Sequence, residues 1–277
     1  MPTSTSPSMP VIFAAHGAPM LLDDEGWVGE LADWAAAMPR PRAILVVSAH
    51  WDESPTTIGA TRAIPLVYDF YGFPDRFYQL QYPAPGAPEL AERVRGLLAG
   101  RNLAVVDQPA RGLDHGVYVP LLCMYPAADI PVLQISMPGL EPAPLVELGR
   151  ALAPLRDEGV LIFGSGFLTH NLRARGEATP GWAREFDAWA ADAIARFDID
   201  TLADFSARAP AVHLALPTTE HFTPLLVAAG AAADGDHATS FPITGYWTPF
   251  SGALTRRSVE FGSGAAAGAL APAPEKL

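Results

Sequence analysis

Residues 11–15 have the sequence VIFAA, and three further apolar runs follow: AILVVSA at 43–49, VLQIS at 132–136 and VLIF at 160–163. Each run is flanked by Gly, Pro or a change of polarity. Runs of this length without regular alternation are typical of strands buried on both faces. Between them the leucines of residues 145–155 recur at helical spacing. The pattern predicts an α/β fold, a single-domain αβα sandwich with a largely parallel central sheet.

A second helical segment carries an apolar stripe made of Trp182, Phe186, Trp189, Ala193 and Phe197. An aromatic stripe can belong to a cofactor pocket, but at helical spacing it is more often ordinary core packing. We therefore expect this helix to pack on the core.

The length of 277 residues favours one large domain. Neither a low-complexity linker nor a repeat of fixed period interrupts the chain, so we expect one domain over residues 10–262. Residues 1–9 and 263–277 are rich in Ser, Thr, Ala, Gly and Pro, and we expect them to be loosely ordered tails.

The charge balance argues against nucleic acid as a partner. Lys and Arg number 18 against 30 Asp and Glu, a net charge of −12, whereas phosphate binding needs a basic face. The single cysteine, Cys123, excludes an internal disulfide framework and lies in an apolar run that predicts burial. No leader peptide or membrane-length apolar run is evident, so we expect no membrane association and a cytoplasmic location.

The placement of the histidines is the main functional signal. His16 follows the first apolar run, His50 follows the second, and His170 follows the fourth run and its glycine turn. In open α/β sheets the ligand crevice lies beyond the carboxyl ends of the strands. Three histidines at three such ends are therefore expected to converge, although they are far apart in the sequence.

Two more histidines lie in short motifs, His115 in GLDHG and His221 in EHFTPLL near the expected start of a helix. For any one of the five, a capping or hydrogen-bonding role is the simpler interpretation. Neutral imidazole is also a common ligand of zinc and suits Fe(II). We expect His213 and His237 to lie on the surface.

Other catalytic signatures are missing from the sequence. Residues 164–166, GSG, do not complete a nucleophile elbow, and no Walker A or dinucleotide-binding glycine motif is present. Glu220 precedes His221, and adjacent helical residues point about 100° apart. We therefore prefer His221 as a ligand, with Glu220 as its hydrogen-bonding or capping partner.

Seven motifs occur in a fixed order: HGAPM (16–20), SAHWD (48–52), YDFYGFP (68–74), YPAPGAPELA (82–91), GLDHG (112–116), GSGFLTHNL (164–172) and EHFTPLL (220–226). In this order they resemble the class III extradiol ring-cleavage dioxygenases, in the branch similar to DOPA 4,5-dioxygenase. The resemblance covers about residues 10–262. It implies one mononuclear metal at the carboxyl end of the sheet, bound by His16, His50 and His221.

The resemblance also implies an activity: O2-dependent cleavage of a substituted catechol next to its diol, which gives a semialdehyde. Fe(II) is the metal expected for activity, and Zn(II) is expected to occupy the same three-imidazole site without redox chemistry. His115 and His170 are implied as acid–base residues. We assign His170 as the base at a catechol hydroxyl and His115 as the acid at the leaving oxygen.

Some neighbouring residues keep two interpretations. Asp114 could orient an imidazole or cap a turn, and the loop 68–74 could cover the substrate ring or be a packed surface loop. The chain departs from the family pattern at Tyr118, at 216–218 (LPT) and at 251–255 (SGALT). These departures spare the five histidines and leave the identity of the catechol open.

The cation for an anionic substrate also stays open, with candidates Arg62, Arg76, Arg111 and Arg173. Surface placement is the simpler expectation for each of them.

Two other functions fit the same residues. A zinc-dependent hydrolase would use the three-histidine metal to activate water, with a further histidine moving the proton. A metal-binding protein without catalysis would need only the ligands. Turnover of catechols with Fe(II) and O2 distinguishes these alternatives. The sequence does not determine the oligomeric state.

Overall fold

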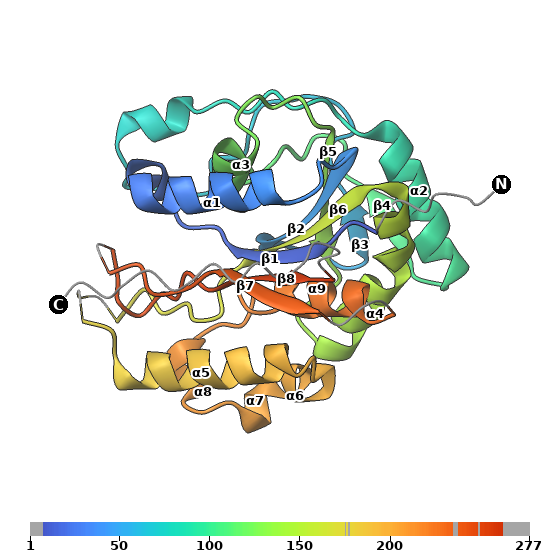
Figure 1. Cartoon of the computed structure of the whole chain (residues 1–277). Coiled ribbons are helices and arrows are strands. Elements are labelled where there is room, and N and C mark those ends of the chain that lie inside the picture. The colour runs from blue at the N-terminus through green and yellow to red at the C-terminus, as the bar shows by residue number, and fades with distance from the viewer. Residues whose placement is uncertain (1–7, 175, 177, 235–237, 249, 263–277) are drawn as a thin grey trace.

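The computed structural model describes residues 8–262 except 175, 177, 235–237 and 249. In this part of the chain one eight-stranded sheet has the order β4-β3-β5-β2-β6-β1-β8-β7 (Figure 1). The strands are β1 (Val11–Ala15), β2 (Ala43–Asp52), β3 (Thr56–Ile58), β4 (Val105–Asp107), β5 (Val132–Met137), β6 (Val160–Gly166), β7 (Thr239–Ile243) and β8 (Ser258–Phe261).

The four strands at the centre of the sheet, β5, β2, β6 and β1, are mutually parallel. β3 and β4 pair in parallel with each other, but β3 runs antiparallel to β5. At the opposite edge β8 runs antiparallel to β1, and β7 runs antiparallel to β8. The predicted, largely parallel sheet is therefore confirmed in its centre, and the antiparallel pairings lie toward its two edges.

Helices cover both faces of the sheet. In Figure 1, α1 and α3 lie above it, and α4, α9 and the α5–α8 group lie below it. The helices are α1 (Glu25–Ala37), α2 (Pro88–Gly100), α3 (His115–Met124), α4 (Pro142–Leu152), α5 (Gly181–Ala195), α6 (Ile199–Ala203), α7 (Phe205–Arg208), α8 (Val212–Ala215) and α9 (Pro224–Ala232). Short 3-10 turns are η1 (Pro19–Asp23), η2 (Asp75–Gln79) and η3 (Ala153–Glu158). Within the described residues no helix has the length and apolarity needed to cross a membrane.

Alternation along the buried strands divides the core into two clusters. In β2, Ile44 and Val46 pack with α1 and α3, whereas Leu45 and Val47 pack on the side of α2, α4 and α9. Successive strand side chains point to opposite faces, so an uninterrupted apolar run fills both layers at once. This explains why the apolar runs of the sequence form the centre of an αβα sandwich, as predicted.

The predicted bounds hold for β1, and β6 continues three residues beyond its predicted end, to Gly166. β2 also continues three residues past its apolar run, to Asp52, so His50 lies inside the strand and not after it. The pairing of β2 with β5 shifts register between Val47 and Asp52. Such irregularities re-aim side chains at the end of a strand.

The aromatic stripe of α5 packs as core, as predicted: Phe186 and Ala193 are fully buried, with Trp182 and Trp189 packed against the same cluster. Of the predicted tails, 1–9 and 263–277, all but Ser8 and Met9 lie outside the described residues, and the bounds 10–262 of the domain stay a prediction.

One close approach links the sheet to the later helices. The backbone N–H of Phe167 donates to the carbonyl of His221 over 2.8 Å, so the end of β6 holds the turn that precedes α9. A Cβ atom on Gly166 would lie 2.0 Å from that same carbonyl oxygen. Glycine is therefore required where β6 meets His221.

We expect Gly166→Ala to lower the free energy of unfolding by about 2 kcal/mol or more, because backbone must move to admit the methyl group. The matched control is Gly96→Ala on the exposed face of α2, where no atom lies within 4 Å of the added Cβ. That change should stabilise the protein by about 0.5–1 kcal/mol. Urea unfolding of both variants checks the pair, and equal stabilities would contradict the close approach.

Candidate metal centre and active site

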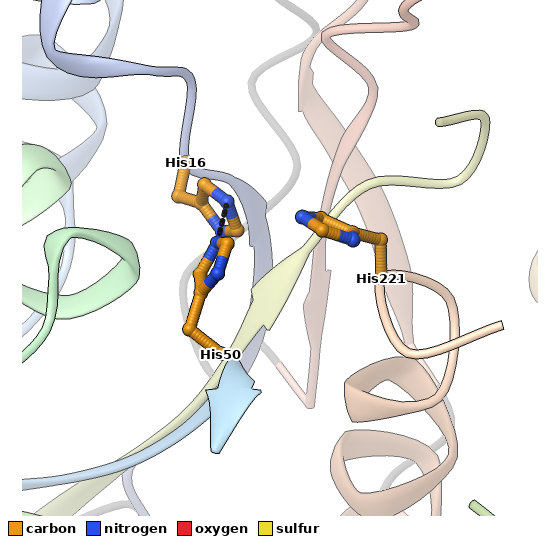
Figure 2. Close-up of side chains that lie close together, drawn as sticks. All are labelled: His16, His50 and His221. Atoms are coloured by element: carbon orange, nitrogen blue, oxygen red, sulfur yellow. Dashed lines mark hydrogen bonds between the residues drawn. The ribbon is translucent and has the colours of Figure 1, made fainter. Parts of the chain in front are cut away.

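Three histidines from distant parts of the chain meet at the carboxyl end of the sheet. His16 follows β1, His50 lies near the end of β2, and His221 lies in the turn before α9. One ring nitrogen from each histidine faces the other two, and these three nitrogens all lie within 4.8 Å of one another. Figure 2 shows the rings of His16 and His50 in contact and the ring of His221 facing them. The structure thus brings together the three residues that the resemblance implied as ligands.

Hydrogen bonds fix which nitrogen of His16 carries a proton. The hydroxyl of Ser165 donates to the carbonyl of Gly116, so Ser165 Oγ accepts from Nδ1 of His16, 2.9 Å away. The His16 ring is therefore protonated on Nδ1 and presents a lone pair on Nε2. In the same way, Nδ1 of His221 donates to Glu220 Oε1 over 2.9 Å and leaves Nε2 free.

The third ring completes the set. Nε2 of His50 lies 3.1 Å from Nε2 of His16, a distance at which the two nitrogens share one proton or one cation. The other nitrogen of His50, Nδ1, lies 3.5 Å from Asp69 Oδ2. The carboxylate therefore favours the proton of His50 on Nδ1 and leaves a lone pair on Nε2. Two nitrogens bound at about 2.1 Å to one metal at a right angle are about 3.0 Å apart. The observed spacing thus suits two ligands of a single ion.

Burial keeps these imidazoles neutral, as metal binding requires. Desolvation, followed by the neighbouring histidines, lowers the pKa of His16 and of His221 well below the usual 6.5. Burial and then His115 lower the pKa of His50 to about 3, although Asp69 acts in the opposite direction. Three neutral imidazoles with converging lone pairs fit a divalent transition metal such as Fe(II) or Zn(II).

Two other groups in the described residues could also surround a cation: His50 with Asp69 and His115, and His170 with Glu220 and His221. In each of them a carboxylate is already paired with a ring nitrogen, at 2.7 Å for His115 and at 2.9 Å for His221. We therefore interpret these carboxylates as partners that orient imidazoles rather than as ligands.

His115, the first residue of α3, lies beside this set. Its ring centroid is 4.0 Å from that of His50, and its Nδ1 lies 2.7 Å from Oδ1 of Asp69. Burial alone would raise the pKa of Asp69, but the hydrogen bond and charge of His115 outweigh burial and lower it. An ionised carboxylate thus accepts from Nδ1, which leaves Nε2 of His115 available for another partner.

Asp69 was not predicted as a site residue. It lies in the segment YDFYGFP, where it is the one acidic residue among aromatic side chains, and it contacts His115 across 46 positions of the chain. The available signal was therefore weak, because no local spacing connects the two residues.

His170 lies on the other side of the set. Its ring stacks on that of His221 with centroids 3.4 Å apart and an interplanar angle of 11°. Burial lowers the pKa of His170 to about 4, so the ring is neutral at pH 7. Both predicted acid–base residues therefore adjoin proposed metal ligands, His115 beside His50 and His170 beside His221.

Asp114 has neither of the roles that we weighed for it. Its carboxylate accepts from Ser48 Oγ over 2.8 Å and from Gln134 and Arg111, and it makes no side-chain cap on α3. Because Ser48 Oγ also accepts from the backbone N–H of His50, this buried carboxylate supports the end of β2. The prediction of an imidazole partner or a turn cap was wrong, because the side chain points into the sheet and not along the turn.

The remaining expectations concern the surroundings of the site. Cys123 is buried and His213 is exposed, as predicted, while His237 lies outside the described residues. Arg76 pairs with Asp23 at 2.6 Å, whereas Arg62 and Arg173 are exposed. Arg111 bonds to Asp114 and to the carbonyl of His50.

The loop 68–74 adjoins the site. Its Asp69 binds His115, and the ring of Phe70 lies edge-on to His115 with centroids 5.7 Å apart. The next residue, Tyr71, is 91% exposed. The loop therefore has one end against the histidines and the other in solvent.

Comparison with known proteins supplies the family. Residues 10–248 match the family model described as the catalytic LigB subunit of aromatic ring-opening dioxygenase. The chain belongs to the LigB family. Membership confirms the resemblance to extradiol dioxygenases, the α/β fold and the class of enzyme, and it agrees with a metal site built from histidines.

Individual relatives agree with the LigB match. A Beta vulgaris protein named 4,5-DOPA dioxygenase extradiol is 43% identical over 235 residues, which cover 82% of this chain and 88% of the relative. An Escherichia coli protein of the same name is 38% identical over 270 residues, covering 93% and 96%. The crystal structure of an uncharacterized Escherichia coli K12 protein superposes with a TM-score of 0.77 at 35% identity, covering 92% of this chain and 100% of that one.

We expect His16→Ala, His50→Ala and His221→Ala each to abolish stoichiometric metal binding, because two imidazoles hold a divalent ion much less tightly than three. Elemental analysis after loading with Fe(II) or Zn(II) measures the bound metal, and circular dichroism shows whether each variant folds. His213→Ala, an exposed histidine on α8, is the matched control and should bind metal fully. Full occupancy in all three variants would show that the ligands lie elsewhere.

Proposed function

We propose that this chain is an extradiol dioxygenase that cleaves the ring of a substituted catechol with O2 and gives a semialdehyde. The observation that carries the proposal is the convergence of three imidazole nitrogens, from His16, His50 and His221, with two further imidazoles beside them. Three protein ligands leave positions on a metal for a bidentate substrate and for O2, as in other non-haem iron oxygenases.

The substrate proposal rests on the relatives. Those at 43% and 38% identity are named 4,5-DOPA dioxygenase extradiol, so DOPA is the first catechol to test, with cleavage at the 4,5 bond. Neutral ligands leave the full charge of a divalent ion in place, and this favours a charged catecholate over a neutral phenol.

Fe(II) is the proposed metal, and when bound it supplies the redox-active centre at which catecholate and O2 react. Zn(II) suits the same ligands but lacks redox chemistry, so a zinc-loaded chain is expected to bind catechol without cleaving it.

The two flanking histidines are proposed to move protons. His170 is neutral at pH 7 and has a lone pair to accept a proton from a catechol hydroxyl. His115, held by Asp69 through Nδ1, would take the proton of the other catechol hydroxyl on Nε2 and give it to the leaving oxygen. Phe70, edge-on to His115, gives the substrate ring an apolar neighbour on the loop 68–74.

We expect His115→Ala and His170→Ala to retain stoichiometric metal but to lose about 10²- to 10⁴-fold in kcat, the usual contribution of a positioned acid or base. The pH dependence of kcat should change in both variants, because a titrating group has been removed. Steady-state oxygen uptake measures these values, with His213→Ala as the control. Wild-type turnover in both variants would assign the two rings a structural role.

The reaction itself is tested by loading metal-free protein with Fe(II) under anaerobic conditions, adding a panel of catechols that includes DOPA, and then admitting O2. We expect one O2 consumed per ring opened and a coloured semialdehyde, with no uptake by the zinc-loaded protein. No O2 uptake with any catechol, together with ester or amide hydrolysis by the zinc form, would instead favour a zinc-dependent hydrolase.

A further inference from the structure

The carboxylate of Asp69 lies between two histidines, His50 and His115. Its Oδ1 lies 2.7 Å from Nδ1 of His115, and its Oδ2 lies 3.5 Å from Nδ1 of His50. One carboxylate thus faces both a proposed metal ligand and a proposed acid–base residue. Each contact is with Nδ1, so in both rings the opposite nitrogen, Nε2, points away from the carboxylate.

Oδ1 of Asp69 accepts two hydrogen bonds from His115, one from the ring and one from the backbone. Besides the ring nitrogen, the backbone N–H of His115 donates to the same Oδ1 over 3.2 Å. This backbone bond holds the carboxylate at the start of α3 independently of the ring. The imidazole therefore meets a fixed acceptor, and rotation about its χ angles would break the shorter of the two bonds.

The loop that carries Asp69 is anchored on either side of the carboxylate. The hydroxyl of Tyr68 donates to the carbonyl of Leu80 over 2.6 Å, and the ring of Phe70 packs against Tyr78 with centroids 4.9 Å apart. The residues on both sides of Asp69 are thus held by the segment 78–80. This arrangement is what orientation of an imidazole requires, because an acceptor on a mobile loop would leave the ring free to turn.

We propose that Asp69 is a positioning residue for ring cleavage: its Oδ1 holds the Nδ1–H of His115 and so presents Nε2 as the nitrogen that exchanges a proton with the substrate. Oδ1 accepts from Nδ1 whether the ring carries one proton or two, so the assignment of Nε2 holds in both states. The logic is that of the Asp–His pair in serine proteases, where the carboxylate fixes tautomer and orientation without touching substrate. This inference rests on the proposed dioxygenase function and deepens it.

The test uses the full-length protein loaded with Fe(II), with DOPA as the substrate. Asp69→Ala removes the acceptor, and Asp69→Asn keeps an oxygen acceptor without the charge. Asp75→Asn, an exposed carboxylate six residues along the same segment, is the matched control and should match the wild type. We expect Asp69→Ala to lower kcat by about 10²-fold or more with KM changed only a few-fold, and Asp69→Asn to lower kcat less.

Non-additivity shows whether Asp69 acts through His115. In a His115→Ala background, Asp69→Ala is expected to have no further effect on kcat, since the ring that it orients is gone. An equal fold-loss in both backgrounds would overturn the proposal. Bound metal per chain is measured in parallel and should stay stoichiometric in Asp69→Ala and Asp69→Asn. Loss of the metal from both would overturn the proposal, because Asp69 would then be needed for metal binding itself.

A readout without turnover separates this proposal from the proposed function. Long-range ¹H–¹⁵N spectra of the zinc-loaded protein report which ring nitrogen of His115 is protonated. We expect Nδ1–H in the wild type and in Asp75→Asn, and a shift toward the Nε2–H tautomer in Asp69→Ala. An Nε2–H tautomer in the wild type would overturn the positioning role. Failure of the wild type to cleave any catechol would overturn the proposed function, whereas the tautomer result would still decide the structural assignment.

Discussion

The contact between Nε2 of His16 and Nε2 of His50, 3.1 Å apart, is the constraint to which the surrounding structure is adapted. Two ring nitrogens at this distance repel each other unless a proton or a cation lies between them. Ser165 holds the proton of His16 on the far side of its ring, and Asp69 offers a place for that of His50. A divalent ion can therefore lie between the two Nε2 lone pairs with little rearrangement of the imidazoles, and that is the physical basis of the proposed metal centre.

Close backbone packing maintains this contact. A Cβ on Gly116 would lie 2.4 Å from Ser48 Oγ and 3.0 Å from Cδ2 of His50, so α3 approaches the end of β2 as nearly as glycine allows. That approach also places the carbonyl of Gly116 on the hydroxyl of Ser165, which in turn fixes His16. The start of α3 thus serves both sides of the site, since the residue before Gly116 is His115, the proposed acid.

Much of this arrangement could be predicted from the sequence, because parallel strands bring their carboxyl ends to one edge. His16, His50 and His170 were predictable from the apolar runs before them. β3, β4, β7 and β8 were not predicted, since they are short strands toward the two ends of the sheet. The edge strands β4 and β7 are also mostly incompletely buried, so they lack a long apolar run. The contacts of Asp69 with His115 and of Asp114 with Ser48 and Gln134 were missed for another reason. They join residues 20 to 66 positions apart, and no local pattern encodes them.

The proposed function depends on a single ion held by three neutral imidazoles, and a crystal structure of the anaerobic Fe(II)-loaded protein would show whether that ion is bound as proposed. Diffraction at the iron edge locates the metal independently of the protein atoms. We predict one anomalous peak bonded to Nε2 of His16, His50 and His221 at about 2.0–2.2 Å, with Asp69 and Glu220 still paired with their imidazoles. A peak bonded to either carboxylate, with Nε2 of His16 outside bonding distance, would rule out the three-imidazole centre.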